Sequence, residues 1–462
     1  MSGIPIDLAY LVASALFILA LKGLAHPRTS QRGNWMGAAG MLLAVIATLL
    51  DRRIVSVGIL LAGILVGSAA GAPLALKVPM TAMPQMVGLL NGLGGGASVL
   101  VAVAALADLA AADMFPSIPL ALAAVASAFI GTVTFWGSLV AFGKLQGLLS
   151  EKSIRFPGQR ALPVALAAVA LVPAAGFVTD PSHLPKLLLL VAVSSVLGVL
   201  VLLPVGGADM PVMIALLNSF SGLAAAATGF VLFNNVLIIA GSLVGASGLI
   251  LTQIMCRAMN RSLGSVLMGI SATGPAAGKA EEIYTGRVKS TSPEEVALLL
   301  DSARRVVVVP GYGLAVAQAQ YAVADLSELL EKRGIEIEFA IHPVAGRMPG
   351  HMNVLLAEAN IPYEKLKDLD EINPTFSETD VVLVIGANDV VNPLARTDQE
   401  SPIAGMPILD VDRARTVVIV KRSLNPGFAG IPNPLFAAPN GVMLFGDGKE
   451  KVLAIIEALK EL

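Results

Sequence analysis

The chain has 462 residues, of which 55% are hydrophobic and 14% are charged, and its net charge at pH 7 is −2. This composition lies outside the range of a water-soluble enzyme and is typical of a protein embedded in a lipid bilayer. The charge balance gives no basic surplus for nucleic acid. The one cysteine, Cys256, excludes a disulfide within the chain, and we expect no metal site.

Nine apolar runs are long enough to cross about 30 Å of hydrocarbon. The first run has no basic residue before it and contains Asp7, so it lacks the charged leader of a signal peptide and we interpret it as a retained span. An odd number of crossings puts the termini on opposite sides of the membrane. The runs lie near residues 4–21, 35–50, 54–72, 84–107, 117–142, 161–178, 184–203, 210–230 and 233–255.

Basic residues indicate which side is the cytoplasm, because cytoplasmic loops collect Lys and Arg. With nine spans, ten of these residues share the side of the C-terminal part and three lie opposite. We therefore expect the C-terminal part in the cytoplasm and the N-terminus outside. The ten are Lys22, Arg28, Arg32, Lys77, Lys144, Lys152, Arg155, Arg160, Arg257 and Arg261, and the three are Arg52, Arg53 and Lys186.

Two spans begin with similar segments, MPQMVGLLN at residues 83–91 and MPVMIALLN at residues 210–218. Both enter from the cytoplasmic side, so Asn91 and Asn218 fall at one depth, about 10 Å by helical rise. The match indicates a repeat with function between its halves, and chance likeness between apolar helices is the alternative. Because a buried amide needs a partner and often marks a pathway, both asparagines are candidates to line one. A stripe of small residues recurs at every fourth position, at Gly63, Gly67 and Gly71. We assign this stripe to helix packing alone.

Ionisable side chains lie in loops or at the ends of the spans rather than deep within them. The carboxylates of Asp108, Asp113, Asp180 and Asp209 are all at ends. A proton path through these helices would therefore lack a relay of its own. We expect a partner chain to supply the ionisable group, or ordered water to bridge the amides.

The charged residues are concentrated in the last third of the chain. We divide the chain into a membrane domain at residues 1–256, a linker or hinge at 257–291 and a cytoplasmic domain at 292–462. A segment at 274–280 resembles a P-loop but is one residue short and lacks Ser or Thr after its lysine, so we reject ATP binding. Ser292, followed by a proline and two glutamates, predicts the start of a helix.

Strand and helix patterns alternate in the cytoplasmic domain. The order predicts a Rossmann-like, doubly wound, mostly parallel sheet, whose ligands bind beyond the carboxyl ends of the strands. We expect strands near residues 305–309, 336–341, 380–385, 407–410, 416–421 and 441–445, and helices near 314–333, 350–360 and 449–460.

A glycine turn follows the first expected strand and opens a helix, which is the context of a pyrophosphate-binding turn. The turn contains Gly311, Tyr312 and Gly313, and Val316 stands where a third glycine often sits.

The ends of two other strands favour NADP over NAD. A sheet specific for NAD should carry Asp or Glu at the end of its second strand, but that strand closes with His342. Lys421, Arg422 and Ser423 end the fifth strand and offer two cations and a hydroxyl to a 2′-phosphate.

Two more loops at this edge carry candidate residues. Arg347 lies in a loop rich in Gly and Pro and could contact a phosphate, whereas we interpret His342 and His351 beside it as surface residues. Asp389 follows Gly386 at another strand end. It is a candidate polar group near a nicotinamide or a titratable coupling residue, and a structural turn aspartate is the alternative.

Together these motifs resemble one family, the proton-translocating nicotinamide nucleotide transhydrogenases. The loops are similar to the family's NADP-binding domain, and the nine spans before them resemble its beta subunit. The likeness is carried by the glycine turn with Ala317-Gln318-Ala319-Gln320, by His342 through Leu356, and by Gly386-Ala387-Asn388-Asp389, Lys421-Arg422-Ser423 and Leu444-Phe445-Gly446-Asp447.

The resemblance implies that this chain binds NADP(H) and accepts hydride directly from NADH on a separate alpha subunit. It implies a nucleotide bound in the reverse sense to an ordinary Rossmann dehydrogenase, covered by a loop around Gly427 and Gly430. The expected partners are alpha subunits with the NAD site and further membrane spans, in a dimer of the assembled enzyme in the inner (plasma) membrane. The expected cofactor-binding residues are Gly311, Tyr312, Gly313, Val316, Arg347, Gly386, Asn388, Asp389, Lys421, Arg422, Ser423, Gly427, Gly430, Gly446 and Asp447.

The resemblance also implies that hydride exchange is coupled to proton translocation. Asn218 and Asp209 match residues associated with the family's proton path, but relatives often have histidine where this chain has Asn91. This departure favours a proton-binding group on another chain. Hydride transfer itself needs no acid–base residue. We assign Asp389 to the catalytic site, either as a polar group near the nicotinamide or as a titratable coupling residue. We expect residues 257–291 to act as a two-state element between the bundle and the nucleotide site.

The alternative function is a channel or transporter whose cytosolic Rossmann domain senses a nucleotide. The chain has no Thr-Val-Gly-Tyr-Gly-like filter, and a sensor would more often carry the acid expected for NAD.

Overall fold

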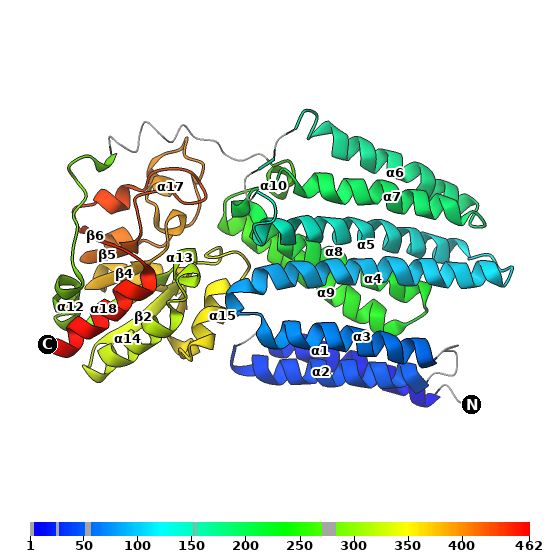
Figure 1. Ribbon diagram of the computed structural model, residues 1–462, viewed down its shortest axis with the longest axis horizontal. Helices are drawn as coiled ribbons and strands as arrows, with labels where there is room; N and C mark the ends of the chain where they lie inside the picture. Colours follow the sequence, from blue (N-terminus) through cyan, green and yellow to red (C-terminus); the bar gives the residue numbers. More distant parts are fainter. Residues whose placement is uncertain (1–3, 25–26, 51–56, 151–152, 155, 270–282) are drawn as a thin grey trace. The chain divides into compact units, whose positions relative to one another are not determined.

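The computed structural model describes residues 4–24, 27–50, 57–150, 153–154, 156–269 and 283–462 (Figure 1). The chain forms two compact units. The first contains Met1–Pro204 with Met213–Ile250, and the second contains Val205–Val212 with Leu251–Leu462. The 274–280 segment that resembles a P-loop falls outside the described residues, as does most of the middle of the expected hinge.

Nine helices in the described residues are long and apolar enough to cross a membrane, which confirms the predicted number of spans. Their boundaries differ from the expected ones by up to eight residues, at the start of α2, mainly because polar residues at the ends continue the helices. The helices are α1 (Ile4–Leu24), α2 (Pro27–Leu50), α3 (Val57–Lys77), α4 (Met83–Ala111), α5 (Ile118–Leu145), α6 (Ala161–Thr179), α7 (Leu184–Leu202), α8 (Met210–Val231) and α9 (Asn235–Ala258).

Glycines let several of these helices approach closely. A methyl group added at Gly95 of α4 would lie 2.6 Å from the carbonyl oxygen of Gly131 in α5, and one added at Gly222 of α8 would lie 2.8 Å from that of Gly241 in α9. These contacts show that small residues mediate helix packing in this bundle.

The stripe on α3 is different. A methyl group added at Gly63, Gly67 or Gly71 would meet no other atom of the described chain within 4 Å. The stripe therefore has no packing neighbour within the described residues, and its assignment to helix packing stays a prediction. Small residues recurring every fourth position show only that a helix can be approached closely, and they do not identify a neighbour.

The two repeated segments form similar local structures. A short 3-10 turn at Met80–Ala82 leads directly into α4, and another at Gly207–Asp209 leads directly into α8. Each helix then has proline at its second position and its asparagine at the ninth. The sequence repeat is thus also a repeat of secondary structure.

A six-stranded sheet forms the core of the second unit. The strand order is β3-β2-β1-β4-β5-β6, and every neighbouring pair is parallel. This order confirms the Rossmann-like, doubly wound fold, in which the chain reverses direction across the sheet between β1 and β4. The strands are β1 (Arg305–Pro310), β2 (Glu336–Ile341), β3 (Leu366–Asp368), β4 (Val381–Ile385), β5 (Thr416–Lys421) and β6 (Gly441–Phe445).

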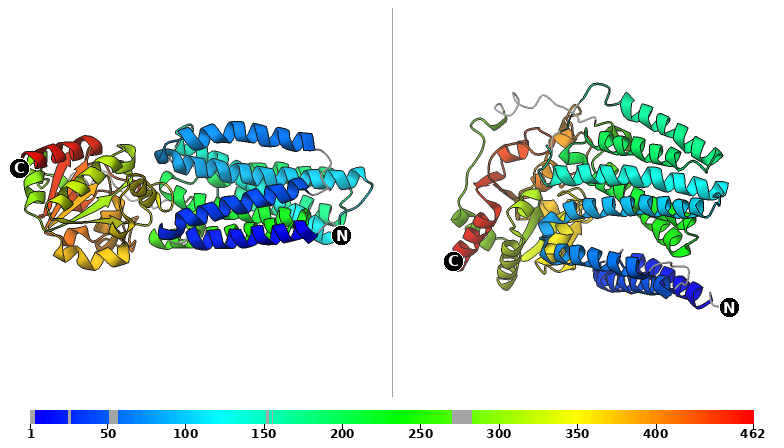
Figure 2. Two further views of the ribbon diagram at one scale, coloured as in Figure 1. Left: turned by 90° about the horizontal axis from the view of Figure 1, so that it is seen from below. Right: turned by 45° about the vertical axis from the view of Figure 1, so that its right-hand side comes forward.

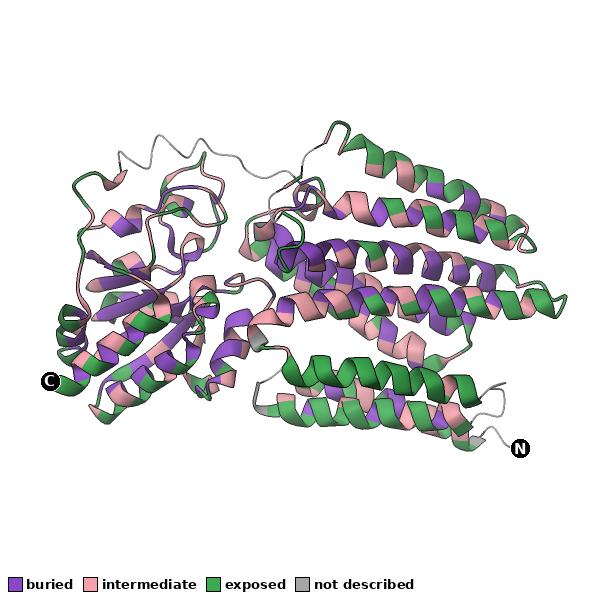
Figure 3. Ribbon diagram, in the orientation of Figure 1, coloured by how far each residue is buried: buried purple, intermediate pink, exposed green. Residues whose placement is uncertain are grey.

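Both faces of the sheet are covered, as the left view of Figure 2 shows. Every residue of β4 is buried, because side chains alternate between two covered faces. Figure 3 shows the buried strands between helices whose outer faces are exposed. The helices of this unit include α12 (Pro293–Asp301), α13 (Tyr312–Val316), α14 (Gln320–Lys332), α15 (His351–Glu358), α17 (Leu394–Thr397) and α18 (Gly448–Glu461).

The predicted strand at residues 407–410 is wrong. Ile408 and Leu409 are buried, but the segment crosses the core as extended chain and belongs to no strand. The Leu409 amide donates to the Val390 carbonyl, and the Ile408 carbonyl accepts from the Asn373 side chain. The apolar pattern that predicted a strand therefore reflects the burial of this segment and not its pairing with another strand.

Two further differences follow from short elements. The edge strand β3 was missed because Leu-Lys-Asp has neither an apolar run nor a clear alternation. The expected helix at 314–333 is two helices, α13 and α14, interrupted at Gln318, whose φ is +50°.

A matched pair of substitutions tests the packing of α4. In Gly95→Ala, the new methyl group would meet the Gly131 carbonyl, and overpacking of this kind costs about 1–3 kcal/mol. In Gly63→Ala, the methyl group meets open space, and alanine favours the helix by about 1 kcal/mol. Thermal unfolding of the full chain in detergent should show a lower midpoint for Gly95→Ala only. Equal midpoints for the two variants would contradict the α4–α5 contact.

Candidate functional site

Two loops meet backbone to backbone where the sheet reverses its direction. The Gly311 amide donates to the Ile385 carbonyl at 2.9 Å, and the Gly313 amide donates to the Gly386 carbonyl at 3.0 Å. A methyl group on Gly313 would lie 2.6 Å from the Gly386 Cα atom, and Gly386 has φ +66°. Only glycine fits this junction, because a side chain would push the loops apart and L-residues rarely adopt that φ.

The glycine turn opens α13, a helix of five residues. Val316 ends this helix and is 50% exposed. The third glycine of the usual turn is therefore not needed, because the helix stops before it packs closely along the sheet. The structure therefore places Val316 half exposed at the end of α13.

An aromatic and cationic cluster surrounds Tyr312. The guanidinium carbon of Arg347 lies 4.4 Å from the centre of the Tyr312 ring, a cation–π distance. The rings of Phe428 and His351 have their centres 6.1 Å and 6.5 Å from the same ring. The structure thus brings the loops after β2 and β5 to the glycine turn, as expected for Arg347.

Asp389 joins the loop after β4 to the loop after β5. Its Oδ2 atom accepts a hydrogen bond from the Ala429 amide at 3.0 Å. Its Oδ1 atom is buried and has no hydrogen-bond partner among the described residues. Burial raises the pKa of Asp389, while the Ala429 and Phe428 amides and the Lys421 cation oppose that rise. A carboxylate here holds the neighbouring loop and can change that hold when it binds a proton.

The loop that Asp389 holds requires glycine at two positions. A methyl group on Gly427 would lie 2.7 Å from the Asp389 Oδ1 atom, so a side chain would displace the carboxylate. Gly430 has φ +68°, which favours glycine. Both expected site residues therefore lie in the loop at Asp389.

The basic triplet after β5 points its two cations in different directions. The Lys421 Nζ atom donates to the carbonyls of Ser423 and Asn425 in its own loop, and burial lowers the pKa of this lysine. Arg422 is exposed and pairs with the Asp447 Oδ2 atom at 2.6 Å. Lys421 therefore shapes the loop, whereas Arg422 faces solvent at the rim.

Asp447 has two roles in one side chain. Its Oδ1 atom accepts from the Lys449 amide at 3.0 Å and caps α18. The hydrogen bond from Arg422 holds its pKa below the usual range. Gly446, with φ +151°, lets the chain turn before this cap. These two expected residues lie together beside Arg422.

Asn388 is fixed by residues that the sequence did not single out. The Asn433 side chain donates to the Asn388 backbone carbonyl at 3.1 Å and to its Oδ1 atom at 3.0 Å. The Asn433 amide donates to the Tyr284 hydroxyl, whose ring stacks on Phe436. The Asn388 Nδ2 atom is buried without a partner in the described chain. The sequence feature that could have singled out Asn433 is its position between two prolines.

The interpretation of His342 and His351 as surface residues is wrong. They are 2% and 0% exposed, and burial lowers the pKa of each to about 4. The His342 Nε2 atom lies 2.8 Å from the Pro407 carbonyl oxygen, which it can reach only as a donor. The His351 Nδ1 atom accepts from the Arg347 amide at 3.0 Å. Both rings hold the loop that carries Arg347, and a glycine-rich sequence gave no sign of this burial.

The expected proton-path residues fall into two groups. Asn91 is buried, and its Nδ2 atom donates to the Ile214 carbonyl of α8 at 3.4 Å, while Asn218 is partly buried on the same helix. Asp209 is 2% exposed and pairs with Arg261 at 3.1 Å within the second unit. The sequence did not predict this ion pair.

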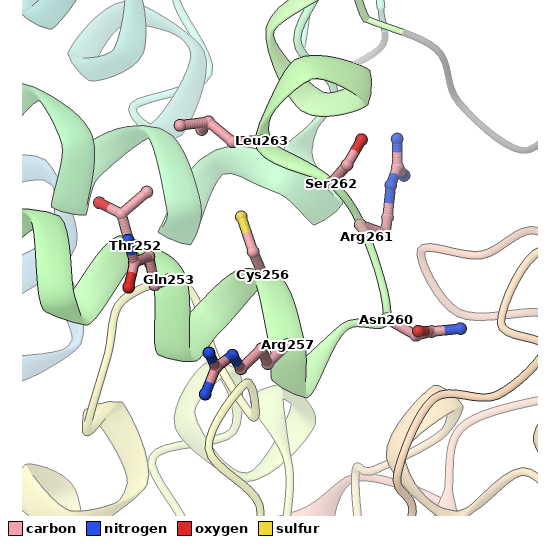
Figure 4. Close-up of a pocket in the computed structure, with 8 residues that line it drawn as sticks. All are labelled: Thr252, Gln253, Cys256, Arg257, Asn260, Arg261, Ser262 and Leu263. Atoms are coloured by element: carbon pink, nitrogen blue, oxygen red, sulfur yellow. The ribbon is translucent and has the colours of Figure 1, made fainter.

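Arg261 borders a hollow of about 420 Å³ at the end of α9. Figure 4 shows Cys256 and Arg257 on the last turn of α9 and Arg261 beyond it. In the described residues, no group of three or more His, Cys, Asp or Glu side chains could hold a metal ion. The lining residues are Thr252, Gln253, Cys256, Arg257, Asn260, Arg261, Ser262 and Leu263.

Comparisons with known proteins agree along nearly the whole chain. A family model described as "NAD(P) transhydrogenase beta subunit" matches residues 6–458. Two sequences named NAD(P) transhydrogenase subunit beta, from Rhodospirillum rubrum and from a named strain of that species, are each 47% identical over 468 aligned positions. Each alignment covers 98% of this chain and 98% of the relative.

The buried histidines predict a dependence of stability on pH. Their folded pKa of about 4 lies below the unfolded value of about 6.5. The unfolded chain therefore binds more protons between these values, and each histidine lowers the free energy of unfolding by up to about 1.4 kcal/mol per pH unit as the pH falls. Chemical denaturation of the full chain should show a shallower pH dependence for His342→Gln. The control is His183→Gln, at an exposed loop position, and an unchanged slope in His342→Gln would contradict neutral burial.

Proposed function

The chain belongs to the NAD(P) transhydrogenase beta subunit family, and we propose that it binds NADP(H), accepts hydride from NADH on an alpha subunit and couples this exchange to proton translocation. The nine long apolar helices found in the described residues indicate a multi-pass membrane protein. The family name indicates a nicotinamide nucleotide and an alpha subunit as partner. Three parts are our proposal: that the bound nucleotide is NADP(H), that NADH is the hydride donor, and that the exchange is coupled to proton translocation.

The observation that supports this proposal most strongly is the glycine junction between the loops after β1 and β4. Its two backbone hydrogen bonds bring Gly311–Gly313 against Gly386 where doubly wound sheets bind ligands. Buried polar atoms beside it, Asn388 Nδ2 and Asp389 Oδ1, lack partners in the described chain. A polar ligand at this edge would satisfy them, which is a requirement for buried polar groups.

The charges around the junction favour a nucleotide with an additional phosphate. Arg347 is held beside Tyr312, and Arg422 lies exposed at the end of β5. No Asp or Glu ends β2, where an NAD-specific sheet would carry one. We assign the 2′-phosphate to Arg422 and Ser423, with Lys421 shaping their loop, and the remaining phosphates to Arg347 and the glycine turn.

NADP(H), when bound, supplies the hydride chemistry, and the chain positions it and excludes water. We propose that the loop with Gly427 and Gly430 covers the nucleotide and that Asp389 controls this cover. Ionised Asp389 accepts the Ala429 amide and holds the loop. Protonation weakens that acceptor, so the loop loosens and the nucleotide is released more readily.

Coupling requires energy from the membrane. One proton that moves inward through about 150 mV releases about 3.5 kcal/mol, which shifts an equilibrium a few hundredfold. We propose residues 1–256 as the translocating domain, 292–462 as the NADP(H) domain and 257–291 as the hinge between them. Residues 270–282 of that hinge lie outside the described chain.

The distribution of basic residues and the family membership support a membrane location, an orientation and a partner for this protein. We place the protein in the inner (plasma) membrane, with the NADP(H) domain in the cytoplasm and the N-terminus outside, because basic residues favour that side. We propose that it works only with its alpha subunit, which carries the NAD site and further spans, in a dimer of the assembled enzyme.

Turnover in sealed vesicles tests the function. Vesicles with both subunits should reduce an NAD analogue from NADPH and move protons, whereas this chain alone should bind NADP(H) without turnover. Turnover without proton movement would contradict coupling, and indifference to the 2′-phosphate would contradict the choice of NADP(H).

Arg422→Ala should weaken NADP(H) binding about tenfold or more, because a charge-assisted contact to phosphate contributes about 1.5–3 kcal/mol. NAD(H) binding by the assembled enzyme should be unchanged. The control is Arg415→Ala, which removes an exposed arginine paired with Asp380, before β5 begins. Calorimetric titration with NADP measures both, and equal affinities would refute the assignment of Arg422.

Asp389→Asn should remove a pH dependence of NADP(H) affinity. In the unchanged protein, affinity should fall as the pH drops through the raised pKa of Asp389, because the protonated side chain holds the loop less well. The asparagine variant should bind weakly at every pH. Fluorescence titration of NADPH between pH 5 and pH 8 measures this, and parallel curves for the two proteins would exclude Asp389 as the titrating group.

A further inference from the structure

The last residues of the expected hinge are bonded to the outer edge of the sheet. The Met443 amide of β6 donates to the Lys289 carbonyl at 2.8 Å, and the Thr291 amide donates to the Met443 carbonyl at 2.9 Å. These two bonds make an isolated parallel bridge between Ser290 and Met443, beside the edge strand β6. The Lys289 Nζ atom also donates to the Pro439 carbonyl at 2.7 Å. The hinge therefore ends as a short extension of the sheet.

Tyr284 fixes the hinge at a second point. Its ring is nearly parallel to that of Phe436, with an interplanar angle of 16° and 6.3 Å between the ring centres. Its hydroxyl oxygen accepts a hydrogen bond from the Asn433 amide at 2.7 Å. Tyr284 and Val288 both pack against the hydrophobic core of the second unit. A displacement of this part of the hinge must therefore break these contacts or move the residues that make them.

Asn433 connects Tyr284 to the loop after β4. Asn433 is 0% exposed, and its Nδ2 atom donates to the Asn388 carbonyl at 3.1 Å and to the Asn388 Oδ1 atom at 3.0 Å. The remaining groups of Asn433 are engaged too, because its Oδ1 atom accepts from the Leu435 amide and its carbonyl accepts from the Phe436 amide. A buried residue with every polar group engaged cannot shift without losing hydrogen bonds. The Tyr284 hydroxyl is thus linked through one rigid residue to Asn388.

Phe436 connects Tyr284 to the basic triplet after β5. Phe436 is 0% exposed, and the Lys421 Nζ atom lies 5.6 Å from the centre of its ring, within the range of a cation–π contact. The same ring stacks on Tyr284. One hinge side chain therefore supports two loops of the proposed nucleotide site, the loop with Asn388 and the loop that Lys421 shapes.

We propose that Tyr284 is a positioning residue for the NADP(H) site, which ties the end of the hinge to Asn388 and Lys421. This inference rests on the proposed function, because it takes the nucleotide to bind at this edge of the sheet. While Tyr284 holds Asn433, the Asn388 side chain is fixed with its unpartnered Nδ2 atom available to the nucleotide. When the hinge withdraws Tyr284, the Asn433 amide loses its acceptor and Asn388 loses its support. NADP(H) then binds more weakly, since apparent affinity falls with the fraction of the chain in the binding-competent state.

Tyr284→Phe tests this role, because phenylalanine keeps the ring against Phe436 and removes only the hydroxyl. NADP(H) binding by the full chain should weaken about fivefold or more, as expected when a buried amide is left without its acceptor. Tyr284→Leu, which also removes the stacked ring, should weaken binding further. In the assembled enzyme, the KM for NADPH should rise, whereas a single transfer of hydride between nucleotides already bound should keep its rate. Calorimetric titration and single-turnover kinetics measure these effects.

Tyr321→Phe is the matched control. Tyr321 is 51% exposed on the first turn of α14, and its hydroxyl bonds to the Glu358 carboxylate. This variant should bind NADP(H) as tightly as the unchanged chain. Unaltered affinity in Tyr284→Phe, or equal losses in the two variants, would overturn the positioning role. An unchanged chain that does not bind NADP(H) would instead overturn the proposed function.

A double substitution shows whether Tyr284 acts through Asn388. Asn388→Ala should weaken NADP(H) binding by itself. Adding Tyr284→Phe to it should then cause little further loss, because residues in one hydrogen-bond network are not additive. Fully additive losses would mean that Tyr284 stabilises the fold without acting on Asn388, and they would overturn the inference.

A proton gradient tests the connection to the hinge. In sealed vesicles with both subunits, imposing a gradient should change the KM of the unchanged enzyme for NADPH. In Tyr284→Phe this change should fall by about half or more, because part of the coupling free energy passes through the contact that the variant loses. A change of full size in Tyr284→Phe would overturn the role of Tyr284 in the hinge. Absence of any change in the unchanged enzyme would overturn the proposed coupling.

Discussion

Two hydrogen bonds between loop backbones determine how the proposed nucleotide-binding edge of the sheet is built. The amides of Gly311 and Gly313 meet the carbonyls of Ile385 and Gly386, and a side chain on any of these glycines would separate β1 from the loop after β4. With the loops joined, Tyr312 lies where Arg347, His351 and Phe428 surround it. Asp389 then lies three residues beyond Gly386, within reach of the Ala429 amide. The remaining features of the edge depend on this close approach.

The same energetic rule acts in both units, although their solvents differ. A buried polar group costs several kcal/mol unless it finds a partner. In the second unit, His342 and Asn433 meet this cost by bonding to backbone groups, and in doing so they hold loops in place. In the first unit, Ser127 and Thr228 meet it by bonding to each other and to helix carbonyls. Loops gain rigidity from such bonds, and neighbouring helices gain fixed contacts with one another.

The proposed nucleotide site contains a group that can exist in two states at small cost. Asp389 has one oxygen engaged and one unpartnered in the described chain, so binding of a proton changes how it holds its neighbour. A coupled machine needs elements of this kind, because a ligand shifts an equilibrium only by its different affinity for two states.

Local patterns were sufficient for much of the architecture. The lengths of the apolar runs predicted nine spans, and the alternation of strands and helices predicted the parallel sheet, because hydrophobic periodicity reports directly which solvent each residue meets. The glycine turn at Gly311 could be predicted too, since its backbone demands a particular residue. Family likeness, rather than periodicity, identified the loop with Gly427 and Gly430.

Other features depended on residues distant in sequence, and only the folded chain decided them. Residues 407–410 have the apolar character of a strand, yet they fill the core outside the sheet. Their backbone groups bond to Val390 and Asn373, which lie elsewhere in the chain, and not to a neighbouring strand. The burial of His342, the support of Asn388 by Asn433 and the meeting of Ser98, Ser127 and Thr228 likewise join distant segments. Composition and spacing therefore determined which elements form and which solvent they enter. Tertiary structure decided which polar groups face each other, because hydrogen bonds act over about 3 Å and no local pattern specifies which distant segment comes that close.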